Sequence, residues 1–165
     1  MGKVKSIELT QGRQTIVDSD DYIKFGQVKW YYGCGGYAIR NRNKEGADSY
    51  NRVTVLLHRE IMNAEQGSMI DHINGDTLDN RKENLRFCTS SQNNINQKLR
   101  KDNKSGFKGV IWNKEAKKWR AEVGCKGKSV FVGDFMNLQE AARAYDKAAI
   151  ELFGEFAHLN FPNKD

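Results

Sequence analysis

The feature that most constrains this chain's fold is a polar, basic interruption at residues 98–105, "KLRKDNKS", which offers no apolar anchor for a core. Only 38% of the 165 residues are hydrophobic and the mean hydropathy is −0.76, which is low for one large core. We therefore expect small modules with thin cores, separated here by a linker. Residues 98–104 hold four basic side chains and one acidic one, so the linker is expected to become ordered only on a polyanion.

Residues 1–57 are predicted to form a β-rich N-terminal region. This region has five short runs rich in β-branched and aromatic residues. They are separated by turn-forming segments such as "TQG", "DSDD" and "GCGG", and by a polar loop from Asn41 to Asn51. The runs are "KSIEL", "QTIVD", "VKWYY", "GYAIR" and "VTVLL". This pattern predicts a small antiparallel sheet whose aromatic residues pack in the protein or lie along nucleic acid.

Residues 58–97 are predicted to hold a short helix at "HREIM", a strand at "NLRFCT" and a helix beginning at "SSQNNINQ", because serines favour helix N-termini. Residues 106–162 are predicted to form three strands followed by a helix. The strands are "GFKGVIW", "KWRAEVGC" and "KSVFVGDF". Asn137 and Glu140 make a capping box at the start of the helix, and Gly154 is expected to end it in the left-handed conformation.

One face of this last helix is apolar at helical spacing, and its alanines allow close approach to one face of the sheet. The residues of that face are Leu138, Ala141, Ala142, Tyr145, Ala148, Ala149 and Leu152. The other face of the sheet is expected to be open and basic, with Lys108, Lys117, Lys118, Arg120, Lys126 and Lys128. The predicted fold class is therefore α+β, with a β-rich N-terminal region and a three-stranded antiparallel sheet plus helix at the C-terminus.

The net charge of +6 and the pI of about 9.2 favour polyanionic partners. Cys34, Cys88 and Cys125 lie far apart and form no Cys-x-x-Cys pair, which argues against a disulfide framework or a zinc knuckle and fits a reducing cytoplasm. No apolar run is long enough for a membrane span, and the start lacks the apolar region of a signal peptide. We expect a soluble, intracellular protein without a membrane partner.

The segment "DHINGDTLDNRKENLR", residues 71–86, combines the groups that phosphodiester cleavage needs. The Asp71 carboxylate is a hard ligand for a divalent cation such as Mg²⁺ or Mn²⁺. The His72 imidazole can take a proton from water near neutral pH. Their side chains would point to opposite sides of a strand, which suits in-line attack, since water enters and the alkoxide leaves on opposite sides of phosphorus.

One carboxylate would hold a cation loosely, so a second oxygen ligand is expected nearby. The candidates are Asn84, Asn93, Asn94 and Asn96. A turn-forming Asp beside a surface or capping His would give the same dipeptide without any reaction, so the pair alone does not decide the matter.

The motifs "HREIM", "IDHINGDTLDNRKENLR" and "CTSSQNN", in this order and spacing, resemble the HNH endonuclease family, and more narrowly its phage homing-type branch. The resemblance spans about residues 53–96. It implies a ββα-metal fold, in which a hairpin and a helix surround one divalent cation. It also implies His72 as general base, Asp71 and Asn93 as metal ligands, and Asn84 as the residue that ties the hairpin loop and positions the site.

The same resemblance places His58 at an upstream His-Arg, where it would pack the short helix against the hairpin. Arg81 and Arg86 flank the loop, and they either hold DNA phosphates or are solvated.

Residues 105–162 resemble the AP2 domain over nearly their whole length. The matching pieces are "GFKGV", "KWRAEV", "VGDF" and "EAARAYDKAAIELFGEFAHLNFP". The resemblance implies a sheet lying in the DNA major groove, with contacts from Lys108, Arg120 and Lys128, to which Lys118 is added as a basic strand residue. Trp112 and Trp119 would pack or contact sugar. The plant pattern has Arg where Ile111 stands and Trp where Phe131 stands, so the DNA sequence read by plant domains is not transferred.

The leading hypothesis is a metal-dependent endonuclease acting on double-stranded DNA. Its expected parts are a β-rich region (1–57), an HNH module (58–97), a basic linker (98–105) and an AP2-like module (106–162). We expect a monomer or weak dimer in the host cell of a phage, with no small-molecule cofactor. Two alternatives remain: a DNA-binding regulator with a decayed nuclease module, and a structural nucleic-acid packaging protein.

Overall fold

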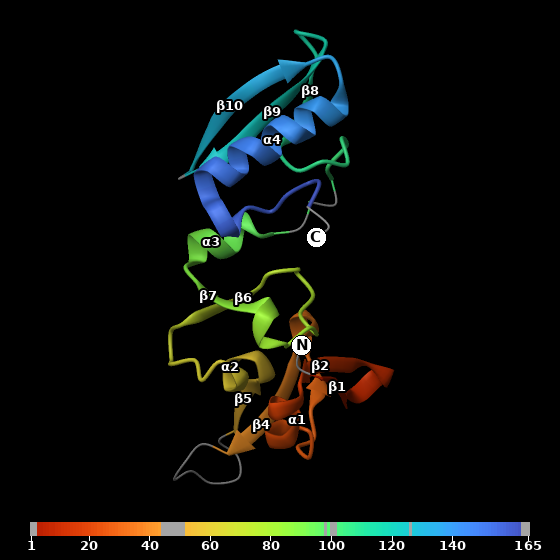
Figure 1. Ribbon diagram of the computed structural model, residues 1–165, viewed down its shortest axis with the longest axis vertical. Helices are drawn as coiled ribbons and strands as arrows, with labels where there is room; N and C mark the ends of the chain where they lie inside the picture. The colour runs from red at the N-terminus through yellow and green to blue at the C-terminus, as the bar shows by residue number, and fades with distance from the viewer. Residues whose placement is uncertain (1–2, 44–51, 98, 100–101, 126, 163–165) are drawn as a thin grey trace. The chain divides into compact units, whose positions relative to one another are not determined.

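The computed structural model describes residues 3–43, 52–97, 99, 102–125 and 127–162 (Figure 1). The chain forms two compact units, Met1–Thr89 and Ser90–Asp165. The predicted linker belongs to the second unit, with its residues 98, 100 and 101 outside the described residues. In its second half, Asn103 Oδ1 accepts a hydrogen bond from the Gly106 N–H at 2.7 Å, so this part folds as a turn on the unit itself.

The first unit contains small antiparallel sheets and short helices. β1 (Val4–Glu8) pairs with β2 (Gln14–Asp18), and helix α1 (Ser19–Phe25) follows. β3 (Tyr31–Tyr32), β4 (Ala38–Asn43) and β5 (Arg52–Leu56) form a second sheet in that order, followed by helix α2 (Leu57–Ile61). β6 (Met69–His72) and β7 (Leu85–Cys88) pair as a hairpin. Short 3-10 turns lie at Thr10–Gly12, Cys34–Gly36 and Lys82–Asn84.

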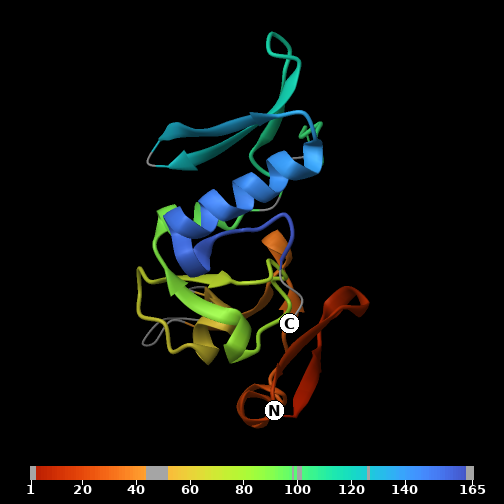
Figure 2. The same ribbon diagram turned by 45° about the horizontal axis from the view of Figure 1, so that its top comes forward.

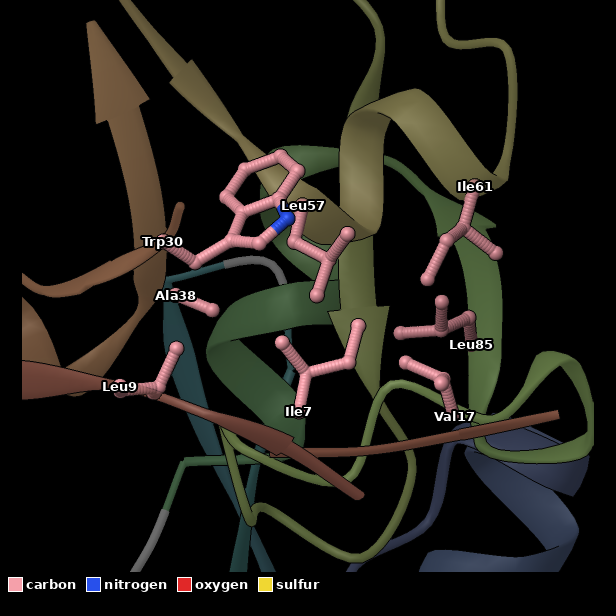
Figure 3. Close-up of a cluster of buried hydrophobic side chains, with 8 residues drawn as sticks. All are labelled: Ile7, Leu9, Val17, Trp30, Ala38, Leu57, Ile61 and Leu85. Atoms are coloured by element: carbon pink, nitrogen blue, oxygen red, sulfur yellow. The ribbon is translucent and has the colours of Figure 1, made fainter. Parts of the chain in front are cut away.

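One hydrophobic core holds the first unit together. Figure 3 shows side chains from the N-terminal strands, α2 and β7 meeting around a common centre. The buried members are Ile7, Leu9, Val17, Trp30, Ala38, Leu57, Ile61 and Leu85. The predicted N-terminal region and the β6–β7 hairpin therefore share a core, instead of each burying its own.

Two local predictions in this unit were wrong. The segment "DSDD" was expected to be a turn, but Ser19, Asp20 and Asp21 begin α1, where acidic side chains complement the helix dipole. The run "VKWYY" forms a strand only at Tyr31–Tyr32, because Trp30 turns into the core and its Nε1–H donates to the Phe25 carbonyl at 3.1 Å. The polar loop predicted from Asn41 lies outside the described residues from 44 to 51, and its first residues extend β4.

The second unit is a three-stranded antiparallel sheet with a helix across one face (Figure 2). It begins with α3 (Ser90–Ile95), and its sheet has the order β10–β9–β8. The strands are β8 (Val110–Asn113), β9 (Lys118–Cys125) and β10 (Lys128–Phe135), and helix α4 (Leu138–Phe153) is followed by a 3-10 turn at Gly154–Phe156. The chain is thus a mixed α and β protein. No helix in its described part is long and apolar enough to cross a membrane.

Helix α4 begins as the sequence predicts. Asn137 Oδ1 accepts hydrogen bonds from the N–H groups of Gln139 (2.8 Å) and Glu140 (3.3 Å), which confirms the N-cap. Gly154 ends the helix with a φ of 55° and a ψ of −128°, so its φ is positive but the expected left-handed helical conformation is not adopted. Leu152 was expected on the apolar face but is 45% exposed, whereas Phe153 packs against the core. Phe153 lies four residues after the buried Ala149, and such residues lie one above the other on a helix.

Gly109 allows β8 to approach α4 closely. Its φ is +68°, and a Cβ atom there would lie 2.1 Å from the Tyr145 ring and 2.6 Å from the Glu122 carbonyl oxygen. Gly106 also has a positive φ, +76°, but a Cβ atom there would meet nothing within 4 Å.

We predict that Gly109→Ala destabilises the second unit by several times more than Gly106→Ala. Both substitutions carry the left-handed penalty of roughly 1 kcal/mol, but only the first drives a side chain into the core. Urea unfolding followed through the methyl signals of Val123 measures both changes. Equal effects would show that Tyr145 moves aside without cost.

Candidate functional site

The β6–β7 hairpin brings Asp71 and His72 into a buried position. Asp71 lies opposite Arg86, and His72 lies opposite Leu85. Asp71 is 6% exposed and His72 is 5% exposed. Because neighbouring residues of a strand point to opposite sides, His72 shares its side of the hairpin with the core residue Leu85, and Asp71 shares the other side with Arg86.

The hairpin loop, residues 73–84, is held by the side chain of Asn84. Its Oδ1 accepts from the Asn74 N–H at 3.0 Å, and its Nδ2 donates to the Asp79 carbonyl at 2.7 Å. The Ile73 N–H donates to the Asn84 carbonyl at 2.9 Å. Asn84, 5% exposed, thus links the two ends of the loop to its middle. The positioning of the site by Asn84 stays a prediction.

The two loop arginines are engaged with carboxylates of the same unit. Arg81 Nε and Nη2 donate to the two oxygens of Asp79 at 2.8 and 2.7 Å, and this partner holds the pKa of Asp79 below its usual range. Arg86 Nε and Nη2 donate to Asp71 Oδ2 at 3.0 and 2.8 Å. Neither arginine is simply solvated, and a phosphate contact from either would have to share or replace these bonds.

His72 lies in a cluster of rings. The His58 ring centroid is 5.1 Å from that of His72, edge to face, and Tyr37 lies 5.2 Å from His58 and 6.0 Å from His72. His72 Nε2 is 3.1 Å from Asn80 Oδ1. His58 therefore packs α2 against the hairpin through His72 itself.

Burial favours the neutral form of both imidazoles. Desolvation lowers the pKa of His58 to about 4, with further lowering from His72 and Arg59. Desolvation also lowers the pKa of His72, although the Asn80 hydrogen bond and the charge of Asp71 oppose the shift. A neutral imidazole is the form that can accept a proton.

Asn93 lies on α3 and therefore belongs to the second unit. Within that unit, the side chains of Lys108 and His158 fasten the end of α3. Lys108 Nζ donates to the carbonyl oxygens of Ile95 and, at 2.7 Å, Gln97, and Asn96 Oδ1 lies 3.2 Å from His158 Nδ1. The first unit by itself does not contain Asn93, so its pairing with Asp71 stays a prediction.

The register of the sheet divides the predicted DNA contacts between two faces. Residues opposite Arg120 and Glu122, including Ile111, Phe131 and Asp134, share the open face with Lys118. Trp112 pairs with Trp119 and Lys128 with Cys125, which places them on the α4 side, where the two tryptophan rings lie 5.0 Å apart.

The open face is also less basic than expected. Arg120 Nε donates to Asp134 Oδ1 at 2.9 Å, and the guanidinium lies over the Phe131 ring. Lys108 is turned toward the α3 carbonyls, and burial lowers its pKa to about 8. Lys117 sits in the turn before β9 with a φ of 51°, and Lys126 lies outside the described residues. Lys118 and Arg120 are the predicted contacts that remain on this face.

Comparison with known proteins finds family matches for two segments of the chain. The HNH endonuclease pattern matches residues 55–95, and the AP2 domain pattern matches residues 105–155. A protein of Acanthamoeba polyphaga mimivirus, named as an uncharacterized HNH endonuclease, is 31% identical over 156 residues, which cover 91% of this chain and 76% of that protein. The chain belongs to the HNH endonuclease family.

Two further relatives match smaller parts of this HNH family member. Protein 3.8 of Escherichia phage T7 is 38% identical over 94 residues, covering 57% of this chain and 77% of that protein. Dehydration-responsive element-binding protein 2A of Arabidopsis thaliana is 41% identical over 69 residues, covering 39% of this chain and 19% of that protein. The predicted combination of an HNH endonuclease with a C-terminal AP2 domain is confirmed.

Asn80 is the contact of His72 that the sequence did not reveal. It stands in "TLDNRKEN", where Asp and Asn are ordinary turn residues, and no spacing rule distinguishes it from Asn74 or Asn84. Tyr37 was likewise assigned only to the packing of a sheet. Its contact with both histidines depends on the fold of residues that are far apart in the HNH chain.

We predict that acid destabilises the first unit through His58. The folded state holds this ring neutral to about pH 4 whereas the unfolded chain binds a proton near 6.5, so the free energy of unfolding falls as the pH drops through that window, by on the order of 3 kcal/mol. His58→Gln should flatten this slope. Urea unfolding, followed through the methyl signals of Leu57 at several pH values, measures it. An unchanged slope in the variant would assign the effect to another group.

Proposed function

We propose that this chain is a metal-dependent DNA endonuclease that hydrolyses phosphodiester bonds. The observation that carries the proposal is a buried, neutral His72 that follows Asp71 directly on β6. His72 acts as the general base and takes a proton from the attacking water. The water oxygen forms a bond to phosphorus as the bond to the leaving oxygen breaks.

Asp71 and Asn93 are proposed to hold one divalent cation, Mg²⁺ or Mn²⁺. Among the described residues, no group of three or more His, Cys, Asp and Glu side chains could hold a metal ion. One carboxylate and one amide oxygen form an oxygen-only donor set, which suits hard cations that keep several waters. When bound, such a cation stabilises charge on the phosphate and on the departing oxygen.

The remaining residues around the site hold these groups in place. Asn84 fixes the hairpin loop, and Arg86 neutralises and orients the Asp71 carboxylate. The ion pair is 7% exposed at Asp71 and 11% at Arg86. Removing Arg86 would leave a buried charge uncompensated, which typically costs about 3–5 kcal/mol. We therefore assign Arg86 first to the positioning of Asp71, and a contact with phosphate is secondary.

DNA placement is proposed for the AP2 unit. Lys118 and Arg120 on its open face would contact the DNA backbone or base edges, as long basic side chains of a sheet in the major groove can. Binding to double-stranded DNA by this unit raises the local concentration of phosphodiester at the HNH site. With one site in each chain, nicking of one strand is the expected outcome for a monomer.

We predict that His72→Ala lowers the rate of plasmid nicking by at least about a hundredfold at saturating Mg²⁺ or Mn²⁺, because general-base catalysis is lost. DNA binding should persist in a gel-shift assay, since the AP2 unit is untouched. Asp71→Asn should have a different effect from His72→Ala. It should weaken cation binding and so raise the metal concentration that nicking requires. Wild-type nicking by His72→Ala would remove the general-base assignment, and binding without nicking by the unmodified chain in either metal would favour a regulator.

We also predict that Lys118→Gln weakens binding of the full chain to all DNA sequences and lowers the slope of log affinity against log salt by about 1. Lys128→Gln is the matched control, because the register places that side chain on the α4 side. Fluorescence anisotropy at several salt concentrations measures both slopes. A larger loss at Lys128 than at Lys118 would mean that the open face is not the face that binds DNA.

A further inference from the structure

A buried chain of hydrogen bonds joins the N-terminal hairpin to His72. Thr15 Oγ1, on β2, donates to the Leu78 carbonyl at 2.7 Å. Asn80 Nδ2 donates to Thr15 Oγ1 at 2.7 Å, and Asn80 Oδ1 lies 3.1 Å from His72 Nε2. The three side chains are 0%, 1% and 5% exposed, in the order Thr15, Asn80 and His72.

The direction of each hydrogen bond in this series follows from the Leu78 carbonyl, which accepts the first one. A carbonyl oxygen can only accept, so Thr15 uses its single hydroxyl hydrogen on Leu78. Thr15 Oγ1 can then only accept from Asn80, which must present its NH₂ group to Thr15 and its oxygen to His72. An inverted Asn80 amide would place two acceptors against each other. His72 Nε2 must therefore donate.

The backbone holds the partners of this chain in register. The Ile16 N–H donates to the Leu78 carbonyl at 2.9 Å, and the Asn80 N–H donates to the Ile16 carbonyl at 2.8 Å. Asp18 Oδ2 accepts from the Lys82 N–H at 2.9 Å. β2 thus docks along the hairpin loop on both sides of Asn80, and its Thr15 hydroxyl has no freedom to seek another partner.

We propose that Asn80 and Thr15 are positioning residues for the general base. They fix the neutral His72 ring as the Nε2–H tautomer, which puts the lone pair that accepts the proton on Nδ1, and they set the plane of the ring. The inference rests on the proposed function of His72. It also gives the β-rich N-terminal region a part in the reaction that its sequence does not indicate.

The decisive substitution is Thr15→Val in the full chain, which removes the hydroxyl and keeps the side-chain volume. Asn80 then loses the group that sets its orientation. We expect the kcat of metal-dependent nicking to fall about 10–100-fold, as is typical when the partner of a functional imidazole is lost, while the KM for DNA is unchanged. Thr15→Ser restores a hydroxyl and should recover most of the rate.

Thr77→Val is the matched control. Thr77 Oγ1 donates to the Gly36 carbonyl at 2.8 Å, so this variant also loses a threonine hydroxyl-to-carbonyl bond that anchors the hairpin loop, without touching the hydrogen bonds to His72. It should keep the wild-type kcat. An equal loss of rate in Thr77→Val and Thr15→Val would assign the effect to general loosening of the loop and overturn the proposal.

Imidazole ¹⁵N shifts of His72, recorded at mildly alkaline pH, provide a readout independent of cutting. Wild type should show the Nε2–H tautomer, and Thr15→Val should show a mixture of tautomers. A wild-type ring in the Nδ1–H form overturns the proposal whatever the kinetics. If the wild-type tautomer is as expected but His72→Ala still nicks DNA, the proposed function fails while the hydrogen-bond chain stands.

Discussion

The exchange of backbone hydrogen bonds between Ile16 and the segment 78–80 is the interaction on which the first unit depends. It joins residues more than sixty positions apart, and it forms an isolated parallel bridge between Ile16 and Asp79. The hairpin loop has few apolar residues to bury, so its own sequence offers little to hold one conformation. Docking on β2 supplies the missing constraint and places the loop against a core that the loop does not build.

Electrostatics in this unit follow from the same burial. Asp71, Asp79, His58 and His72 all lie at 7% exposure or less. A buried carboxylate needs a cationic partner, and Arg86 and Arg81 meet that need for Asp71 and Asp79. Desolvation lowers the pKa of both buried histidines, which favours the neutral imidazole. Burial thus accounts both for the ion pairs of the loop arginines and for the unprotonated histidines, which can accept protons.

Local pattern was sufficient to predict much of the fold. Alternation and turn residues located β2, β9 and β10, and the Asn137 cap located the start of α4. Two errors of the sequence prediction, at Lys128 and Leu152, have physical causes. The strand runs do not state which residues of β10 oppose β9, so Lys128 was assigned to the open face, whereas it pairs with Cys125 on the α4 side. A bulge between Phe131 and Gly133 shifts the register further along the strand. The prediction failed at Leu152 because this residue lies four positions after Ala148, which is only partly buried, whereas Phe153 lies four positions after the fully buried Ala149.

The sequence predicted which residue types form the candidate site, but not which side chains contact them. Asp71 and His72 are adjacent, so the sequence displays their chemistry directly. The contacts of His72 come from Asn80, Tyr37 and His58, which lie on other segments, and the orientation of Asn80 comes from Thr15 on the first hairpin. Such pairs depend on long-range docking, for which a single sequence carries no periodic signal.

The placement of α3 has a consequence for the proposed metal site. The HNH match includes this helix, yet Lys108 and His158 fasten its end to the AP2 unit. The Lys108 ammonium caps carbonyls at the C-terminal end of α3, where a positive charge complements the helix dipole. The proposed metal ligands Asp71 and Asn93 therefore belong to different compact units.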